Sequence, residues 1–334
     1  MKTVIIAEAG VNHNGKISLA KKMIENASKA GADYIKFQLF KAENLATKNS
    51  IKANYVKKNF NKNMSNYEML KNLEFSLEEF LVLKRICKLN KIKFLLSPFS
   101  IDDVYKIEKI GLNTIKIPSG EINNLPYLRY IGRLKKKVIL STGMSNMKDI
   151  SNALKILTNS GTPKKNITIL HCNTEYPTPY IDVNLLAMNT IKEFFDINVG
   201  YSDHTLGIEV PIAAVALGAK VIEKHFTLNK KLIGPDHKAS LSVSELTSMI
   251  SSIRIIEKAI GNKKKIITTS EKKNIIAARK SIVANKNIEK GEIFSIKNLT
   301  TKRPATGFSP MYWDKIVGKK SKKKYKKDEL IKIK

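Results

Sequence analysis

Residues 200–225 read G-Y-S-D-H-T-L-G-I-E-V-P-I-A-A-V-A-L-G-A-K-V-I-E-K-H. Two short runs that end at His204 and His225 enclose an apolar, alanine-rich segment of helical length, residues 206–219. This pattern predicts a strand, a helix and a second strand. Parallel strands joined by a helix are neighbours or near neighbours. The two histidines, 21 positions apart in the sequence, should therefore lie close together at the carboxyl ends of their strands.

The chain has five histidines, and each follows or closes a predicted strand: His13, His171, His204, His225 and His237. Histidines gathered at the ends of several strands are typical of a barrel active site. His204 and His225, with Asp203, Glu223 and Asp236 nearby in the sequence, are candidate ligands of a divalent metal. The alternative is that ordinary loop hydrogen bonds satisfy both imidazoles.

On both sides of this unit, short β-branched runs alternate with amphipathic segments. The predicted strands are residues 4–7, 34–37, 94–96, 114–117, 138–140, 167–170, 198–201 and 220–223. Helical patterns include residues 19–30, 77–89, 150–157, 185–195 and 243–260, the last after Ser242 as N-cap. Eight such units predict a (β/α)8 TIM barrel, with residues 1–262 as the catalytic domain.

Polar residues follow the predicted strands, and in a barrel they would lie on one rim. In chain order they include Glu8, Lys36, Gln38, Ser97, Lys116, Ser119, Glu121, Asn173 and Ser202. Lys36 and Lys116 with the neighbouring hydroxyl and amide groups suit a small substrate that carries phosphate and carboxylate. Glu8 and Glu121 can donate or accept protons, and a metal would polarise a carbonyl oxygen. These groups favour carbon–carbon bond formation between an anionic enol and an aldehyde.

One connection is unusually long. About 35 residues (40–74), rich in Lys and Asn, separate the second strand from the next clear helical pattern. Loops of that length are usually functional or disordered, so we predict a lid over the rim.

The pattern changes after Gly261. Residues 263–275 are predicted to be a basic linker, and residues 276–334 a small β-rich domain with a turn near Lys290 and Gly291. A domain of this size buries little surface alone, so we expect it to dock on another surface.

Composition limits the partners. The 334 residues carry 60 Lys and Arg against 29 Asp and Glu, a net charge of +31. This excess of positive charge suggests nucleic acid as a possible partner. The lysines, however, are spread over nearly every predicted helix, so nucleic acid is not expected. The longest uncharged apolar run, residues 210–219, is too short to span a bilayer. Without a signal peptide or CxxC spacing at Cys87 and Cys172, the sequence predicts a cytoplasmic protein without structural disulfides.

A series of motifs resembles that of the bacterial sialic acid synthases, also called N-acetylneuraminate or, more broadly, nonulosonic acid synthases. The motifs are AEAGVNHNG (7–15), KFQ (36–38), KIPSGE (116–121), STGM (141–144), HCNTEYPTP (171–179), GYSDHT (200–205), IEKHFT (222–227) and GPDH (234–237). Lys302-Arg303-Pro304 with Gly307 resembles the same family's C-terminal SAF (antifreeze-like, β-clip) domain. The resemblance covers essentially the whole chain in order.

The resemblance implies condensation of phosphoenolpyruvate with an N-acetylmannosamine-type aldehyde and water, releasing phosphate by C–O cleavage, with Mn²⁺ or Mg²⁺, to give N-acetylneuraminate. It implies that His204 and His225 bind the metal and that Glu8 is the catalytic acid/base. The residues it places on phosphoenolpyruvate are Lys36, Ser97, Lys116, Ser119, Asn173 and Ser202. The residues it places on the amino-hexose are Gln38, Glu121, Tyr176 and Asp236. It also implies a domain-swapped homodimer, in which Arg303 of the partner subunit contacts the sugar's N-acetyl group.

Alternatives remain at this point. The acceptor can instead be 2,4-diacetamido-2,4,6-trideoxymannose, which would give N,N'-diacetyllegionaminate. More distant alternatives are another metal aldolase on the same fold and a non-catalytic carbohydrate- or nucleic-acid-binding protein on a barrel scaffold. The chain also departs from the family's R-P-G-x-G pattern by having Ala305 after Arg303-Pro304. If that position needs a positive φ, Ala305 would strain the loop.

Overall fold

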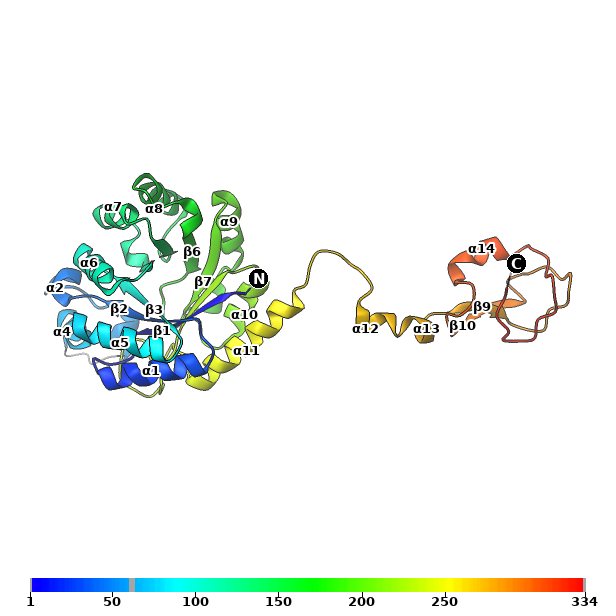
Figure 1. Ribbon diagram of the computed structural model, residues 1–334, viewed down its shortest axis with the longest axis horizontal. Helices are drawn as coiled ribbons and strands as arrows, with labels where there is room; N and C mark the ends of the chain where they lie inside the picture. The colour runs from blue at the N-terminus through cyan, green and yellow to red at the C-terminus, as the bar shows by residue number, and fades with distance from the viewer. Residues whose placement is uncertain (1, 60–63, 333–334) are drawn as a thin grey trace. The chain divides into compact units, whose positions relative to one another are not determined.

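The predicted β-branched runs form eight parallel strands at the centre of the first part of the chain (Figure 1). A computed structural model describes residues 2–59 and 64–332. The strands are β1 (Val4–Gly10), β2 (Tyr34–Leu39), β3 (Lys93–Pro98), β4 (Thr114–Ile117), β5 (Lys137–Ser141), β6 (Ile167–Cys172), β7 (Asn198–Asp203) and β8 (Val221–His225). The ladder runs β3-β2-β1-β8-β7-β6-β5-β4, and its end strands β3 and β4 are in contact. The sheet is thus a nearly closed barrel, and the predicted fold class is confirmed.

Helices surround the strands, as Figure 1 shows. They are α1 (Ile17–Lys29), α5 (Leu77–Leu89), α6 (Ile101–Ile110), α7 (Leu125–Arg133), α8 (Met147–Asn159), α9 (Leu186–Phe195), α10 (Glu209–Ala216) and α11 (Val243–Ala259). Local sequence explains where several begin. The Ser242 hydroxyl accepts the Glu245 N–H while the Glu245 carboxylate accepts the Ser242 N–H, a capping box that confirms Ser242 as the N-cap of α11.

The inside of the barrel has two layers of different chemistry. Side chains alternate across a strand, so inward positions recur every second residue. The apolar layer consists of Ile6, Leu95, Ile139, Leu170 and Val221. Two residues further toward the carboxyl ends of the same strands lie Glu8, Ser97, Ser141, Cys172 and Glu223. This alternation points the candidate site residues into the barrel, above a buried apolar layer.

The long connection after β2 is more regular than the sequence suggests. It contains α2 (Ala42–Leu45), α3 (Asn54–Asn59) and α4 (Asn66–Leu73), with residues 60–63 outside the described part. A capping box between Ser65 and Glu68 begins α4. Phe40, Val56 and Met69 pack together in a small core of their own. The sequence showed no clear helical pattern in this segment, yet the structure has three short helices there. Its action as a lid stays a prediction.

The chain divides into two compact units, Met1–Gly261 and Asn262–Lys334. In the second, β9 (Ser281–Ala284) pairs antiparallel with β10 (Leu299–Lys302), and the short helices are α12 (Thr269–Lys272), α13 (Ile275–Ala278) and α14 (Trp313–Ile316). Ile282, Phe294 and Tyr325 belong to its separate hydrophobic core. Ala305 is not among the described residues with a positive φ, so Ala in place of Gly does not strain this loop. No described helix is long and apolar enough to cross a membrane.

Candidate active site

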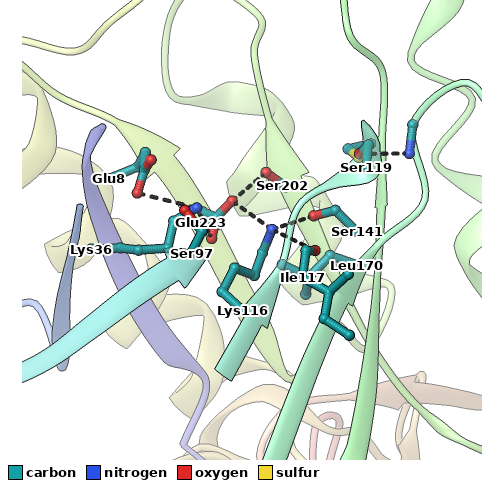
Figure 2. Close-up of polar contacts among 12 residues, drawn as sticks. Glu8, Lys36, Ser97, Lys116, Ile117, Ser119, Ser141, Leu170, Ser202 and Glu223 are labelled. Carbon is teal, nitrogen blue, oxygen red and sulfur yellow. Dashed lines mark hydrogen bonds and ion pairs between the residues drawn. The ribbon is translucent and has the colours of Figure 1, made fainter. Parts of the chain in front are cut away.

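Four buried ionisable side chains, those of Glu8, Lys36, Lys116 and Glu223, form a charged cluster inside the barrel (Figure 2). Lys36 Nζ lies 3.3 Å from Glu8 Oε2 and 3.2 Å from Glu223 Oε2. Lys116 Nζ lies 3.5 Å from Glu223 Oε1. The two lysines predicted to hold an anion therefore share one carboxylate, that of Glu223. All four residues are at most 5% exposed, so water screens these charges little.

The two carboxyls of this cluster differ in acidity. Burial raises the pKa of Glu8 to about 8, although Lys36 opposes the rise. Burial alone would raise the pKa of Glu223 as well, but Lys116 and Lys36 outweigh it and lower that pKa to about 2. At neutral pH, Glu8 is thus mostly protonated and Glu223 ionised. While both lysines carry their protons, the cluster is net positive and suits an anion, with Glu8 as a proton donor beside it.

Serine hydroxyls surround the lysines. Lys116 Nζ donates to Ser141 Oγ over 2.6 Å, and Ser202 Oγ donates to Glu223 Oε1 over 2.9 Å, both drawn in Figure 2. Ser97 Oγ lies 3.4 Å from a backbone oxygen of β2. The structure therefore brings serines from β5 and β7 into hydrogen bonds with the cluster, while Ser97 of β3 is buried and bonded to the neighbouring strand.

Ser119 and Asn173 lie at the ends of β4 and β6. Ser119 Oγ accepts the Gly143 N–H over 3.0 Å and lies 3.4 Å from Cys172 Sγ. A Cβ on Gly143 would lie 2.9 Å from Ser119 Oγ, so glycine is needed for this approach. Asn173 Oδ1 accepts the Glu175 N–H over 2.8 Å, which holds the turn after β6 in place.

The two central histidines are neighbours, as their strands predict. The ring centroids of His204 and His225 are 5.5 Å apart, and Tyr176 stacks on His204 at 4.0 Å. His204 Nδ1 lies 2.5 Å from the Asn173 carbonyl oxygen. The ring must therefore donate from Nδ1, which leaves the Nε2 lone pair free for another partner. Burial lowers the pKa of His204 to about 4 and that of His225 well below its usual value, so both rings are neutral at pH 7.

Asp236 completes this end of the site. His225 Nδ1 is buried without a hydrogen-bond partner and lies 3.9 Å from Asp236 Oδ2. Burial raises the pKa of Asp236 to about 7. A Cβ on Gly10 would lie 3.1 Å from His225 Cε1, so only glycine lets β1 pass this close to the ring.

The histidine pair is compatible with a shared metal ion bound at about 2 Å from each nitrogen. Neutral imidazoles and an unpaired buried nitrogen are what such an ion requires. Within residues 2–59 and 64–332, however, no group of three or more His, Cys, Asp or Glu side chains is placed to hold a metal. Two imidazoles would thus leave further coordination positions to water or substrate.

Three further residues predicted to contact the sugar are Gln38, Glu121 and Arg303. Gln38 is on β2 in register with Ser97, half-buried. The Glu121 carboxylate accepts a hydrogen bond from the Asn124 side chain over 2.6 Å, and burial raises its pKa. Arg303 is exposed on the second unit.

Sequence reasoning missed the roles of Glu223 and Tyr55. Glu223 was considered only as a neighbour of a metal, whereas it pairs with both lysines. The signal was its spacing, since Glu223 and His225 are two residues apart on one strand and must face the same way. Tyr55 on α3 stacks on Tyr176 with centroids 4.7 Å apart. Nothing in the sequence indicates that contact.

The sequence of this chain is similar to those of known proteins. The NeuB family matches residues 23–265, and the SAF domain matches residues 279–334. N,N'-diacetyllegionaminic acid synthase of Campylobacter jejuni is 53% identical over 330 residues, 99% of each chain. The enzyme of the same name from Legionella pneumophila is 41% identical over 95% of this chain and 90% of its own.

A solved structure agrees. The crystal structure of N-acetylneuraminic acid (sialic acid) synthetase from Leptospira borgpetersenii, in complex with citrate, has a TM-score of 0.71 and 35% identity. The match covers 82% of this chain and 90% of the Leptospira chain. From its motifs, its barrel and these relatives, the chain belongs to the NeuB family and is an enzyme of the sialic (nonulosonic) acid synthase class with a C-terminal SAF domain.

Proposed function

We propose that this enzyme is an N,N'-diacetyllegionaminate synthase that condenses phosphoenolpyruvate with 2,4-diacetamido-2,4,6-trideoxymannose and water, releasing phosphate. The observation that carries the choice of acceptor is the 53% identity, over nearly the full length of both chains, with a synthase of that name. The motifs alone placed N-acetylneuraminate first. The relatives favour the alternative, because the structurally similar N-acetylneuraminic acid synthetase is only 35% identical.

The proposed donor site is the lysine cluster. Lys36 and Lys116 approach the Glu223 carboxylate from two sides, at 3.2 and 3.5 Å. An anion that enters here would share these ammonium groups with Glu223. Ser97, Ser119, Asn173 and Ser202 line the same end of the barrel and would supply further hydrogen bonds to phosphate and carboxylate oxygens.

Glu8 is the proposed acid/base. Its pKa of about 8 keeps it protonated at neutral pH, so it can give a proton to the acceptor's aldehyde oxygen as C3 of phosphoenolpyruvate bonds to the aldehyde carbon. Water then adds at C2, and the bond between C2 and the phosphate oxygen breaks as the new hydroxyl becomes the ketone, so that inorganic phosphate leaves with the hydroxyl proton. The proton that water releases returns to Glu8.

His204 and His225 are the proposed ligands of Mn²⁺ or Mg²⁺, which when bound would polarise the acceptor's carbonyl. The hydrogen bond from His204 Nδ1 to the Asn173 carbonyl fixes the tautomer that a ligand needs. Asp236, near His225, and Tyr176, on the face of His204, would position the acceptor sugar, together with Gln38 and Glu121.

The proposed assembly is a domain-swapped homodimer. Arg303 is exposed on the second unit, where its guanidinium is available to another surface. We place Arg303 of the partner subunit on the N-acetyl group of the acceptor, where it would donate a hydrogen bond to the amide oxygen.

Phosphate release tests the proposed reaction. Purified protein is supplied with phosphoenolpyruvate, Mn²⁺ and either the diacetamido sugar or N-acetylmannosamine. We expect release to require both substrates and kcat/KM to be higher for the diacetamido sugar. A higher kcat/KM for N-acetylmannosamine would make the enzyme an N-acetylneuraminate synthase, and no release with any hexosamine would refute the reaction.

A further inference from the structure

An ion pair lies buried beside the two central histidines, outside the charged cluster. Asp203 on β7 and Lys224 on β8 are in register across the two strands, and both side chains are 0% exposed. Lys224 Nζ contacts Asp203 Oδ2 and donates to the Thr205 carbonyl oxygen over 2.6 Å. Neither side chain faces the substrate end of the barrel, because the inward positions on these strands are taken by their neighbours.

This pair brackets His204. Asp203 precedes His204 and Thr205 follows it, and the single ammonium of Lys224 is bonded to both. The Asp203 carboxylate also accepts the Thr205 N–H and hydroxyl, each over 3.0 Å. The Asp203 carboxylate before His204 and the Thr205 carbonyl after it are therefore both bonded to one atom of the neighbouring strand.

Lys224, which carries this nitrogen atom, directly precedes His225. Because side chains alternate along a strand, fixing Lys224 on the outer side of the barrel wall fixes the direction in which His225 leaves the inner side. One ion pair thus holds both rings, which lie 5.5 Å apart between centroids.

We propose that Asp203 and Lys224 are positioning residues that set the spacing of His204 and His225 for divalent-metal binding. The inference rests on the proposed metal site. Stability alone does not account for the pair, since a buried ion pair is often no more stabilising than well-packed apolar residues of the same size. Fixing strand register and side-chain direction is a use that such a pair serves better.

The test separates position from stability. Replacing Lys224 alone by Met strands a buried carboxylate, so that variant can fail to fold. The double variant Asp203→Asn/Lys224→Met leaves no buried charge unpaired and keeps an oxygen to accept the Thr205 N–H. We expect it to fold, with far-ultraviolet circular dichroism like that of the unmodified protein, and to bind Mn²⁺ about 10- to 100-fold more weakly, the usual effect of losing groups that orient metal ligands.

The control is a partly buried ion pair within one helix, whose lysine side chain is 24% exposed. Asp103, 0% exposed, pairs with Lys106 on α6 over 2.8 Å, away from both histidines. Mn²⁺ and phosphoenolpyruvate affinities are measured separately by calorimetry on metal-free protein. Asp103→Asn/Lys106→Met should bind Mn²⁺ as the unmodified protein does, and both double variants should keep their phosphoenolpyruvate affinity.

Three outcomes would count against the inference. A folded Asp203→Asn/Lys224→Met protein with unchanged Mn²⁺ affinity would show that the pair is only structural. Equal loss of Mn²⁺ and phosphoenolpyruvate affinity would show general distortion in place of positioning. Absence of Mn²⁺ binding by the unmodified protein would refute the metal site itself, a result distinguishable from the first two.

Discussion

Replacement of Glu8 by Gln tests the acid/base assignment and its electrostatic basis together. The amide has nearly the shape of a protonated carboxyl but does not titrate. Because burial raises the pKa of Glu8 to about 8, the side chain is mostly protonated at neutral pH. The variant should therefore fold as well as the parent near pH 6, while kcat falls by about 10²- to 10⁴-fold, the usual contribution of a general acid.

The raised pKa of Glu8 also predicts how much the stability of the parent protein changes with pH. The Glu8 pKa rises from 4.5 to about 8 on folding, so the folded state binds more protons between these values and stability falls as pH rises. From about pH 6 to the folded pKa is two pH units, at about 1.4 kcal/mol each, or about 3 kcal/mol. The lowered pKa of Glu223 acts below 4.5, outside this window. The Glu8→Gln variant does not titrate at this position, so it should not lose this stability as the pH rises.

The assay is urea unfolding of both proteins at about pH 6 and about pH 9. The single tryptophan, Trp313, lies in the second unit, so far-ultraviolet circular dichroism must report on the barrel. Relative to the parent, Glu8→Gln should become about 3 kcal/mol more stable at the higher pH. If the difference in unfolding free energy between variant and parent is the same at both pH values, the raised pKa is refuted. Full kcat in the variant would refute the catalytic role.

Three further predictions concern the donor, the metal and the dimer. Lys36→Met and Lys116→Met should each weaken phosphoenolpyruvate binding about 10- to 100-fold, since a hydrogen bond to a charged group contributes about 1.5–3 kcal/mol. Calorimetry measures the Kd, and an unchanged Kd in both variants would show that the anion binds elsewhere. Chelator dialysis should abolish activity and Mn²⁺ or Mg²⁺ restore it; a fully active His225→Ala protein without added metal would contradict the site. Arg303→Ala should lower kcat/KM about 10- to 100-fold, and mixing it with Glu8→Ala should restore activity because one site of the heterodimer keeps both residues. Subunit exchange without restored activity would show that Arg303 does not act across the dimer.

Much of the fold follows from local sequence. The strands were predictable because parallel strands buried on both faces are continuous Val, Ile and Leu runs. The start of α11 was predictable from Ser242 and Glu245. The Ser65–Glu68 capping box of α4 was equally visible, but without a strong hydrophobic stripe this short helix was missed. The packing of α2 to α4 depends on contacts with distant residues such as Val11, which no local pattern encodes.

The site was predictable to the level of strand ends. Alternation along parallel strands brings Glu8, Lys36 and Lys116 to one rim, and the structure places them together. The sequence pattern does not show which carboxylate pairs with which lysine, because that pairing depends on the distances across the barrel. Glu223 pairs with both lysines and stays ionised, while Glu8 is mostly protonated, and only the three-dimensional charges distinguish them. Motifs shared by the whole class likewise leave the acceptor open.

The most direct test of the proposed function is a competition between acceptors. Equal amounts of 2,4-diacetamido-2,4,6-trideoxymannose and N-acetylmannosamine are incubated with enzyme, Mn²⁺ and limiting phosphoenolpyruvate, and the products are separated by mass, so that their ratio reports the ratio of kcat/KM values. A site that pairs with a polar group on one substrate discriminates strongly against an analogue that lacks it. The account predicts that N,N'-diacetyllegionaminate exceeds N-acetylneuraminate by about 10-fold or more. An excess of N-acetylneuraminate would contradict it.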